Sequence, residues 1–345
     1  MTQNRDYIRN KIKGALVGGA IGDALGYAIE FSDEDSIFST YGPDGIHEYE
    51  LDEERGKALV SDDTQMSLFT ANGILLGGGR ETVGDMYEEW LKTQRMSYSK
   101  YQAYKRETDD YCQKSWLMDV PELFADRAPG LTCLSAISEG MGSVSEPANN
   151  SKGCGGVMRV APVGLRYRGD DMEKLDMEGA EIAALTHGHS MSHMSSAMLV
   201  HIVNRLVYGE TSKTLSAIIE DALDTVTLLF DGDEHLEKFK ALMNLAVILS
   251  ENSDDDLSNI HRLGEGWIAE ETLAIALYCS LKYQDNFSRA ITVSVNHKGD
   301  SDSTGAVTGN IIGALLGYDE IEPDWIEDLE LVDVIEKMAD ELSNA

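Results

Sequence analysis

Two runs of glycine at every fourth residue constrain the fold of this 345-residue chain more than any other feature. The first run comprises Gly14, Gly18, Gly22 and Gly26, and the second comprises Gly305, Gly309, Gly313 and Gly317. Because an α-helix repeats about every 3.6 residues, each run leaves one face of a helix as bare backbone. A glycine inside a helix costs roughly 1 kcal/mol relative to alanine, so close packing must offset the cost. We expect the two bare faces to pack against each other as a buried helix pair.

Hydrophobic residues elsewhere also recur with the period of a helix. Further helices are predicted at residues 62–76, 82–95, 131–141, 177–186, 192–208, 215–229, 235–250 and 270–282. Strand-like alternation, as at residues 45–49, is too short and isolated to build a sheet. No Ser/Gly/Pro-rich linker divides the chain, so the sequence predicts an all-α protein with one compact domain over residues 1–345. The Tyr-rich segment 97–116 has weak periodicity and is predicted to be a mobile excursion over a binding site.

The formal net charge of −33 makes nucleic acid and anionic membranes poor partners, because their phosphates would meet a repulsive field. A cationic partner fits better, although acidity that only serves solubility explains the same charge. Glycine repeats also occur in membrane helices, but Asp23 and Glu30 interrupt the first run, and the second is too short to span a bilayer.

The four cysteines, Cys112, Cys133, Cys154 and Cys279, lie far apart and without a CxxC spacing. This distribution predicts reduced core thiols rather than a zinc knuckle or a disulfide scaffold. The polar N-terminus shows no secretory signal pattern, so we expect a cytoplasmic protein.

The first acidic cluster is Ser61-Asp62-Asp63-Thr64, at the start of a predicted helix. Ser61 is a plausible N-cap, and acidic residues in a first helical turn are favoured by the helix dipole. Capping accounts for one or two of these residues, but the cluster holds more carboxylate than capping requires. A hard cation is the alternative explanation, because adjacent ionised carboxylates repel each other.

The second cluster, Asp300-Ser301-Asp302-Ser303-Thr304, begins like a calcium-binding EF-hand loop. The match fails at position twelve, where Ile311 replaces the bidentate glutamate. What remains is a helix N-terminus that presents oxygen ligands. With no His or Cys beside either cluster, Mg²⁺ or Mn²⁺ is favoured over Zn²⁺, and we interpret the two clusters as halves of one site.

Other polar features carry weaker signals. Glu30 follows Asp23 by seven residues on the first glycine helix, and an exposed helix-end glutamate is its simplest explanation. The glycine-rich segment 151–164 allows backbone N–H groups to approach a phosphate, but it matches no phosphate-binding motif, so a tight packing turn is the default explanation. His187, His189 and His193 are candidates for ligand, capping or core roles.

Six blocks in this order resemble the ADP-ribosylglycohydrolase family, which includes the dinitrogenase reductase activating glycohydrolases and the ADP-ribosylarginine hydrolases. The blocks are GDALGYAIEF at 22–31, SDDTQM at 61–66, RAPGLTCLSA at 127–136, SKGCGGVMRVAPVG at 151–164, THGH at 186–189 and GDSDSTGAVTGNIIGALLG at 299–317. The resemblance covers nearly the whole chain. It implies a single orthogonal helical bundle with a binuclear Mg²⁺ centre at one end.

The resemblance also implies roles for individual residues. The implied metal ligands are Ser61, Asp62, Asp63, Asp300, Asp302 and Ser303, where both serines replace a threonine common in the family. The implied substrate-binding residues are Asp23, Gly153, Cys154, Gly155, Gly156, Met158, His187 and His189. The implied catalytic residues are Glu30, Asp62 and Asp302, with the general base left open among these carboxylates.

The activity that the resemblance implies is hydrolysis of the N-glycosidic bond between ADP-ribose and an arginine side chain of a modified protein. Serine-linked ADP-ribose and O-acetyl-ADP-ribose stay open as substrates. Two alternatives remain: an immunity protein that also occludes an ADP-ribosyltransferase toxin by binding, and a family member without activity. The target protein and the oligomeric state are not determined by the sequence.

Overall fold

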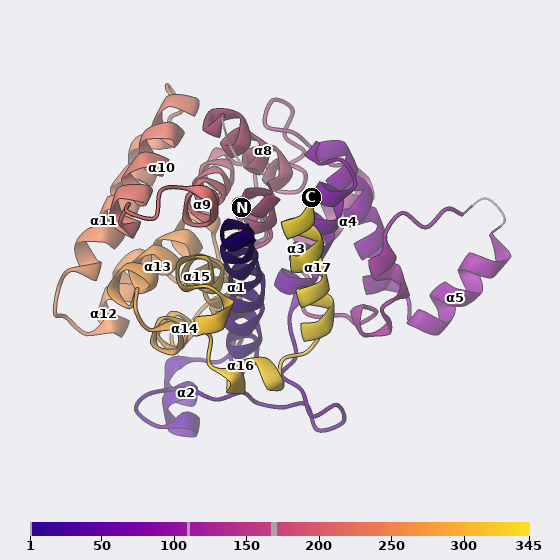
Figure 1. Ribbon diagram of the computed structural model, residues 1–345, viewed down its shortest axis with the longest axis horizontal. Coiled ribbons are helices and arrows are strands. Elements are labelled where there is room, and N and C mark those ends of the chain that lie inside the picture. The colour runs from indigo at the N-terminus through magenta and orange to yellow at the C-terminus, as the bar shows by residue number, and fades with distance from the viewer. Residues whose placement is uncertain (1, 109–110, 167–170) are drawn as a thin grey trace.

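The computed structural model describes residues 2–108, 111–166 and 171–345. These residues form helices and loops, with no strand and only two isolated β-bridges, Ala58–Leu329 and Gly153–Ile268. The all-α prediction is confirmed. Figure 1 shows α1 in the middle of the molecule, flanked by α15 on one side and α17 on the other.

The α-helices are α1 (Thr2–Tyr27), α2 (Glu34–Tyr41), α3 (Asp62–Leu75), α4 (Gly79–Arg95), α5 (Tyr98–Glu107), α6 (Leu131–Glu139), α7 (Ala161–Arg166), α8 (Met172–Ala184), α9 (Ser190–Tyr208), α10 (Leu215–Leu229), α11 (Leu236–Ser250), α12 (Asp256–Leu263), α13 (Ala269–Lys282), α14 (Phe287–Val295), α15 (Ser301–Leu316), α16 (Pro323–Glu327) and α17 (Val332–Asn344). Short 3₁₀ helices lie at Trp116–Asp119, Pro121–Leu123, Cys154–Gly156 and Tyr318–Glu320.

Helices α1 and α15 pack backbone to backbone along their glycine faces, antiparallel to each other. A Cβ atom added at Gly22 would lie 2.0 Å from the carbonyl oxygen of Gly305. One added at Gly18 would lie 2.6 Å from the Gly309 carbonyl oxygen. No side chain larger than a hydrogen atom fits at such distances, so the predicted helix pair is confirmed.

The register of the pair differs from a simple pairing of the two glycine runs. Gly26 faces Ser301 rather than a glycine, since a Cβ at Gly26 would lie 2.2 Å from the Ser301 carbonyl oxygen. Gly317 lies just beyond α15 as its C-cap with a φ of 96°, a left-handed conformation that favours glycine. The pairing therefore brings the C-terminal end of α1 beside the first turn of α15.

Several helices were missed in the sequence, namely α2, α5, α7, α12, α14, α16 and α17. Most are too short for a hydrophobic period to repeat. Helix α17 is different, because its buried Ile335, Met338, Ala339 and Leu342 have helical spacing that the sequence analysis overlooked.

Two further predictions concern the segment 97–116 and the cysteines. Tyr98–Glu107 forms α5, which projects from the other helices in Figure 1, and the Tyr111 hydroxyl donates a hydrogen bond to Glu89 Oε2 (2.8 Å). The mobility of this segment stays a prediction. Residues 109–110 of that segment lie outside the described residues. The four cysteines are free, but Cys112 is exposed and Cys154 is half-buried, so only Cys133 and Cys279 are core thiols.

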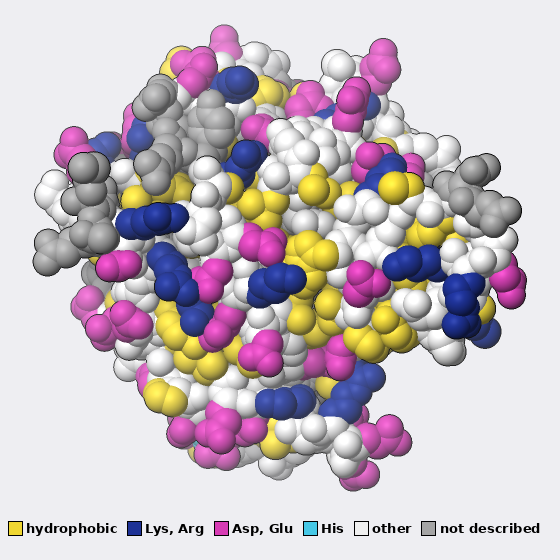
Figure 2. All heavy atoms as spheres, turned by 45° about the vertical axis from the view of Figure 1, so that its right-hand side comes forward, with side chains coloured by type: hydrophobic (Ala, Val, Ile, Leu, Met, Phe, Trp, Pro, Cys, Tyr) yellow, Lys and Arg dark blue, Asp and Glu magenta, His cyan; other side chains and the backbone are white. Residues whose placement is uncertain are grey.

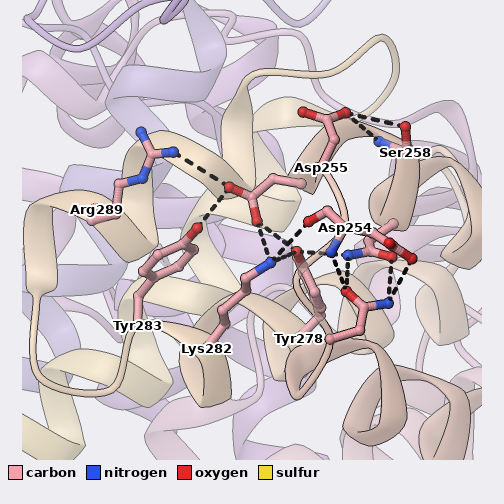
Figure 3. Close-up of polar contacts among 10 residues, drawn as sticks. Asp254, Asp255, Ser258, Tyr278, Lys282, Tyr283 and Arg289 are labelled. Carbon is pink, nitrogen blue, oxygen red and sulfur yellow. Dashed lines mark hydrogen bonds and ion pairs between the residues drawn. The ribbon is translucent and has the colours of Figure 1, made fainter.

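A carboxylate at the start of α12 joins three helices. Asp256 accepts hydrogen bonds from the hydroxyls of Tyr278 (2.5 Å) and Tyr283 (2.6 Å). It also forms ion pairs with Lys282 (3.0 Å) and Arg289 (3.3 Å), and Figure 3 shows these four side chains converging. The network links α12 to α13 and α14.

None of the described helices is both long and apolar enough to cross a membrane.

Replacing Gly309 by alanine tests the dependence on backbone contact. The new Cβ would lie 1.9 Å from the Gly18 carbonyl oxygen, so α1 and α15 must separate. We expect the free energy of unfolding to fall by about 3 kcal/mol or more, measured by thermal and urea denaturation.

Gly84→Ala in α4 is the matched control, because its new Cβ meets only the flexible end of Met141, at 3.2 Å. We expect the control to change stability by no more than about 1 kcal/mol in either direction. Equal effects of the two substitutions would contradict the importance of the glycine contact.

Candidate metal centre

The two acidic clusters meet in space although they are far apart in the sequence. The Ser303 hydroxyl donates a hydrogen bond to Asp63 Oδ2 at 2.9 Å, across 240 positions of the chain. One carboxylate oxygen each from Glu30, Asp300 and Asp302 lies within 4.8 Å of the others. The predicted juxtaposition of the clusters is therefore present, and Glu30 joins it.

Each cluster lies at a helix N-terminus. The Ser61 hydroxyl is the N-cap of α3 and accepts from the Asp63 N–H at 3.1 Å, and Asp300 is the N-cap of α15 and accepts from the Ser303 N–H at 3.3 Å. Asp62 and Asp302 lie in the first turns, where the helix dipoles favour negative charge. The capping roles of Ser61 and Asp300 are therefore present, and the same two helix ends carry the residues predicted as metal ligands.

The sequence suggested that Glu30 lies on the first glycine helix, but in the structure it lies beyond the end of that helix. Helix α1 ends at Tyr27, and Glu30 follows in a turn that carries its side chain to the second cluster. Glu30 as a whole residue is 8% exposed, and its carboxylate atom Oε2 is buried without a hydrogen-bond partner among the described residues. The simple explanation of an exposed helix-end glutamate is therefore wrong.

Asp23 of α1 holds the first cluster in position through hydrogen bonds. Its carboxylate is fully buried and accepts from the backbone N–H groups of Ser61 (3.0 Å) and Thr64 (3.0 Å) and from the Thr64 hydroxyl. These contacts anchor the N-terminus of α3 to α1. The structure gives Asp23 this positioning role, and its predicted contact with substrate stays a prediction.

The loop at the start of the block 127–136, which was given no role from the sequence, holds Asp62 in place. The Arg127 carbonyl accepts from the Asp62 N–H at 3.1 Å, and the Gly130 N–H donates to the Asp62 carboxylate. Between them, Ala128 has a φ of 58°, a strained conformation for a residue with a side chain. The Pro129-Gly130 pair is a turn signal that could have pointed to this loop.

The side chain of Arg127 anchors the same loop. Its guanidinium donates to Glu330 Oε1 at 2.8 Å, while Glu330 Oε2 accepts from the Val60 N–H at 3.2 Å. Arg55 also pairs with Glu330 at 2.5 Å. Because Val60 precedes Ser61 directly, this network fixes the chain at the entrance of the first cluster.

The pKa values of the clustered carboxyl groups are raised, chiefly because burial disfavours the charged form and secondly because Asp302 adds a like charge. The pKa of Glu30 rises to about 9 and that of Asp23 to about 7. The pKa values of Asp62, Asp63 and Asp300 rise as well. Buried Arg159 opposes the rise at Asp62.

These residues fit a divalent cation. Several buried carboxylates converge, and one carboxylate oxygen of Glu30 has no partner, so a cation would neutralise charge that no described residue neutralises fully. The ligand atoms are almost all oxygens, which suits Mg²⁺ or Mn²⁺. From the sequence we expected no cysteine beside the clusters. This expectation was wrong, because folding brings the Cys154 thiol beside the Asp300 carboxylate.

The glycine turn packs against His187. Added Cβ atoms would lie 3.2 Å from His187 Nε2 at Gly153 and 2.9 Å from His187 Cε1 at Gly155. Burial, and next the positive Arg159, lower the pKa of His187 to about 3, so its ring is neutral. Met158 is buried, and its sulfur lies 3.9 Å from the Ser303 hydroxyl, which connects the turn to the second cluster.

His189 and His193 have structural contacts instead. His189 is the N-cap of α9, accepts from the Met191 N–H at 3.0 Å and stacks on His235 with ring centroids 4.5 Å apart. His193 Nε2 bonds the His187 carbonyl at 2.9 Å. The structure thus brings His187, but not His189, against the glycine turn.

Three exposed apolar side chains flank the centre. Phe31 (76% exposed) follows Glu30, Leu131 (83%) follows Gly130, and Trp267 (41%) follows Gly266, whose added Cβ would lie 3.2 Å from the Asp300 carbonyl oxygen. On the face seen in Figure 2, acidic and basic side chains are interspersed with such apolar ones. No sequence pattern assigned a role to these three residues.

The family model described as ADP-ribosylglycohydrolase matches residues 4–345. The chain belongs to the ADP-ribosylglycohydrolase family. A solved structure titled ADP-ribosylglycohydrolase-related protein complex shares the fold of this glycohydrolase family member, with a TM-score of 0.63 at 21% identity, covering 98% of this chain and 99% of that one.

The curated relatives match over part of their length. Human ADP-ribosylhydrolase ARH3 is 27% identical over 213 residues, which are 54% of this chain and 58% of that protein. The ADP-ribosyl-[dinitrogen reductase] glycohydrolase of Rhodospirillum rubrum is 26% identical over 280 residues, which are 79% of this chain and 74% of that protein. ADP-ribosylarginine hydrolase Tri1 of Serratia proteamaculans is 26% identical, over 54% of this chain and 45% of that protein.

The raised pKa values predict how stability depends on pH without metal. Each carboxyl group binds its proton more tightly in the folded protein than in the unfolded chain, where its pKa is about 4. The stability that these groups contribute is therefore fully present below the pKa of the unfolded chain. It is lost as the pH rises through the pKa values of the folded protein, which reach about 7 for Asp23 and about 9 for Glu30. We expect the melting temperature in EDTA to fall by about 5 °C or more between pH 5.5 and 8.5.

Magnesium ions should reverse most of this loss at pH 8.5, as measured by thermal denaturation. Asp302→Asn removes the charge that raises the neighbouring pKa values, so it should flatten the pH dependence in EDTA and abolish the stabilisation by Mg²⁺. Glu234→Gln, at an exposed side chain, is the control and should behave as wild type. A melting temperature that rises with pH in EDTA would contradict the electrostatic account.

Proposed function

We propose that this protein is a Mg²⁺-dependent hydrolase that removes ADP-ribose from modified arginine side chains of proteins. The observation that carries the proposal is the contact between Ser303 and Asp63, which unites two distant acidic clusters beside Glu30. Membership of the ADP-ribosylglycohydrolase family supports the reaction class. The similarity to a relative named ADP-ribosylarginine hydrolase supports arginine as the linkage.

The reaction breaks the bond between ribose C1″ and an arginine nitrogen and adds water, which yields free ADP-ribose and unmodified arginine. The residues that would hold the metal are Ser61, Asp62, Asp63, Asp300, Asp302 and Ser303. Two bound Mg²⁺ ions would supply positive charge for the ribose hydroxyls and lower the pKa of a bound water. Glu30 presents an unpartnered oxygen to the same space and can hold or accept a proton there.

The other residues of the site orient the substrate and the carboxylates. Asp23 and the Arg127–Gly130 loop hold the first cluster rigidly, because Asp62 is bonded through both its N–H and its carboxylate. The turn at Gly153 to Gly156 offers close approach of backbone to a phosphate group, next to neutral His187. The partner is an ADP-ribosylated protein, and the four free cysteines support action in a reducing cytoplasm.

A panel of arginine-linked, serine-linked and O-acetyl-linked ADP-ribose substrates tests the proposal. We expect release of ADP-ribose from the arginine-linked substrate with Mg²⁺ present and loss of release in EDTA, followed by chromatography. Asp302→Ala should lower kcat by about 100-fold or more, because the carboxylates lose their common arrangement. Release from the serine-linked or O-acetyl substrate alone would overturn the arginine assignment.

The double variant Asp62→Ala/Asp302→Ala separates hydrolysis from occlusion of a toxin. If the folded double variant still protects cells against an arginine-specific ADP-ribosyltransferase, protection comes from binding. Loss of protection together with loss of hydrolysis supports the enzyme. A wild-type protein that releases ADP-ribose from none of the substrates would instead indicate an inactive family member.

A further inference from the structure

A groove of about 810 Å³ lies between the segment 47–51, helix α14 and helix α16. The residues proposed for the metal centre do not line it. In Figure 1, α14 and α16 lie at the lower end of the molecule, where α1 ends. A groove of this size holds a peptide side chain with its flanking backbone.

Four carboxylates on the groove are unpaired. Glu48, Glu322 and Asp324 are exposed, and Asp328 is half-buried. Among the described residues, none of the four side chains forms an ion pair or a hydrogen bond, in contrast to Asp256 or Glu330. The groove therefore keeps its full negative charge available to a ligand.

The one guanidinium on the groove is already engaged. Arg289 pairs with Asp256 at 3.3 Å and lies over the Tyr283 ring, 5.4 Å from its centroid. Figure 3 shows its side chain beside Tyr283, within that network. Its contact with Asp256 leaves the four groove carboxylates without a cation of their own.

Two aromatic rings contribute to the wall of the groove: Tyr49 is half-buried, and Trp325, 8% exposed, presents only a small part of its surface to the groove. Tyr49 and Trp325 contact each other edge to face, with centroids 5.0 Å apart, and the Tyr49 hydroxyl donates to the Trp325 carbonyl at 3.1 Å. The Trp325 indole N–H donates to the Ser288 hydroxyl at 2.7 Å. Leu51, 44% exposed, adds an aliphatic surface. An aromatic and aliphatic wall beside carboxylates suits the long stem and charged head of arginine or lysine.

The groove is coupled to the metal centre through the backbone. The Asp328 carbonyl accepts from the Ala58 N–H at 2.8 Å, and Ala58 lies three residues before Ser61. The charge of Asp23, which anchors the first cluster, raises the pKa of Tyr49 after burial does. A chain bound in the groove would therefore lie near the centre rather than on a remote face.

We propose that this groove binds a basic polypeptide segment of the modified protein, with arginine or lysine side chains against Tyr49 and Trp325 and their charges beside Glu48, Glu322 and Asp324. The identity of the partner as the substrate protein rests on the proposed function. The binding of a basic segment does not. A polypeptide fits because the groove combines unpaired charge with an apolar wall along three chain segments.

Binding is tested with a fluorescein-labelled peptide of nine alternating arginine and glycine residues, by fluorescence anisotropy. The groove variant is Glu322→Gln/Asp324→Asn. We expect its affinity to be about 5- to 10-fold weaker than wild type, because two carboxylates beside the cationic side chains are lost. The affinity of the wild-type protein should also fall at about 0.5 M NaCl.

The matched control is Glu220→Gln/Asp231→Asn, two exposed carboxyl groups at α10 and just after it that form no ion pair among the described residues. It changes the net charge by the same amount and should weaken binding by less than about 2-fold. Equal weakening in both variants would show only general attraction to an acidic protein and would overturn the inference. Absence of peptide binding by the wild-type protein would overturn it as well.

A kinetic comparison separates this inference from the proposed function. For an ADP-ribosylated basic peptide, the groove variant should raise KM about 5-fold or more, with kcat unchanged. For ADP-ribosylarginine as the free amino acid, both parameters should match wild type. Should the wild-type protein hydrolyse neither substrate, the proposed function fails, while the anisotropy result still decides whether the groove binds basic segments.

Discussion

The backbone contact between α1 and α15 is the constraint on which the rest of the structure depends. Gly22 and Gly305 meet without side chains between them, so the two helices are far closer than ordinary packing allows. Because the helices are antiparallel, this contact places the end of α1 beside the first turn of α15. Asp23 then reaches the N-terminus of α3, and Glu30 reaches Asp300 and Asp302. The metal centre is thus a consequence of helix packing.

The centre concentrates negative charge that the fold must support. Carboxylates that are buried together without a cation tend to be protonated, and the raised pKa values of Glu30 and Asp62 show this tendency. At Asp62 the Gly130 N–H and buried Arg159 oppose it, and the N–H groups of Ser61 and Thr64 donate to Asp23. Such fixed donors keep the oxygens in place before a cation arrives, which is the preorganisation that a metal site requires.

Charge is used differently at the two ends of the proposed substrate. ADP-ribose is anionic, and a cation bound at the candidate centre, together with the backbone N–H groups, would provide positive potential despite the net charge of −33. The groove at Tyr49 and Trp325 keeps its carboxylates unpaired, which favours a basic protein segment. One acidic protein can therefore accommodate an anionic ligand and a cationic chain at neighbouring positions. The exposed Phe31 and Leu131, which follow Glu30 and Gly130 in the chain, add apolar surface beside the centre.

Local pattern in the sequence was sufficient for the glycine helix pair, the helix cap at Ser61, the helix N-terminus at the second cluster and the resemblance to the family, because spacing along a chain determines which residues share a helix face or a first turn. Local pattern could not place Glu30, because helix α1 ends at Tyr27 and Glu30 lies in the turn that follows. It also could not show that the Asp23 carboxylate accepts hydrogen bonds from the N-terminus of α3. The loop from Arg127 to Gly130, the approach of Cys154 to Asp300 and the groove at α16 also appear only in three dimensions. These features arise from contacts between segments far apart in the chain, and their geometry depends on how closely the helices pack rather than on any local periodicity.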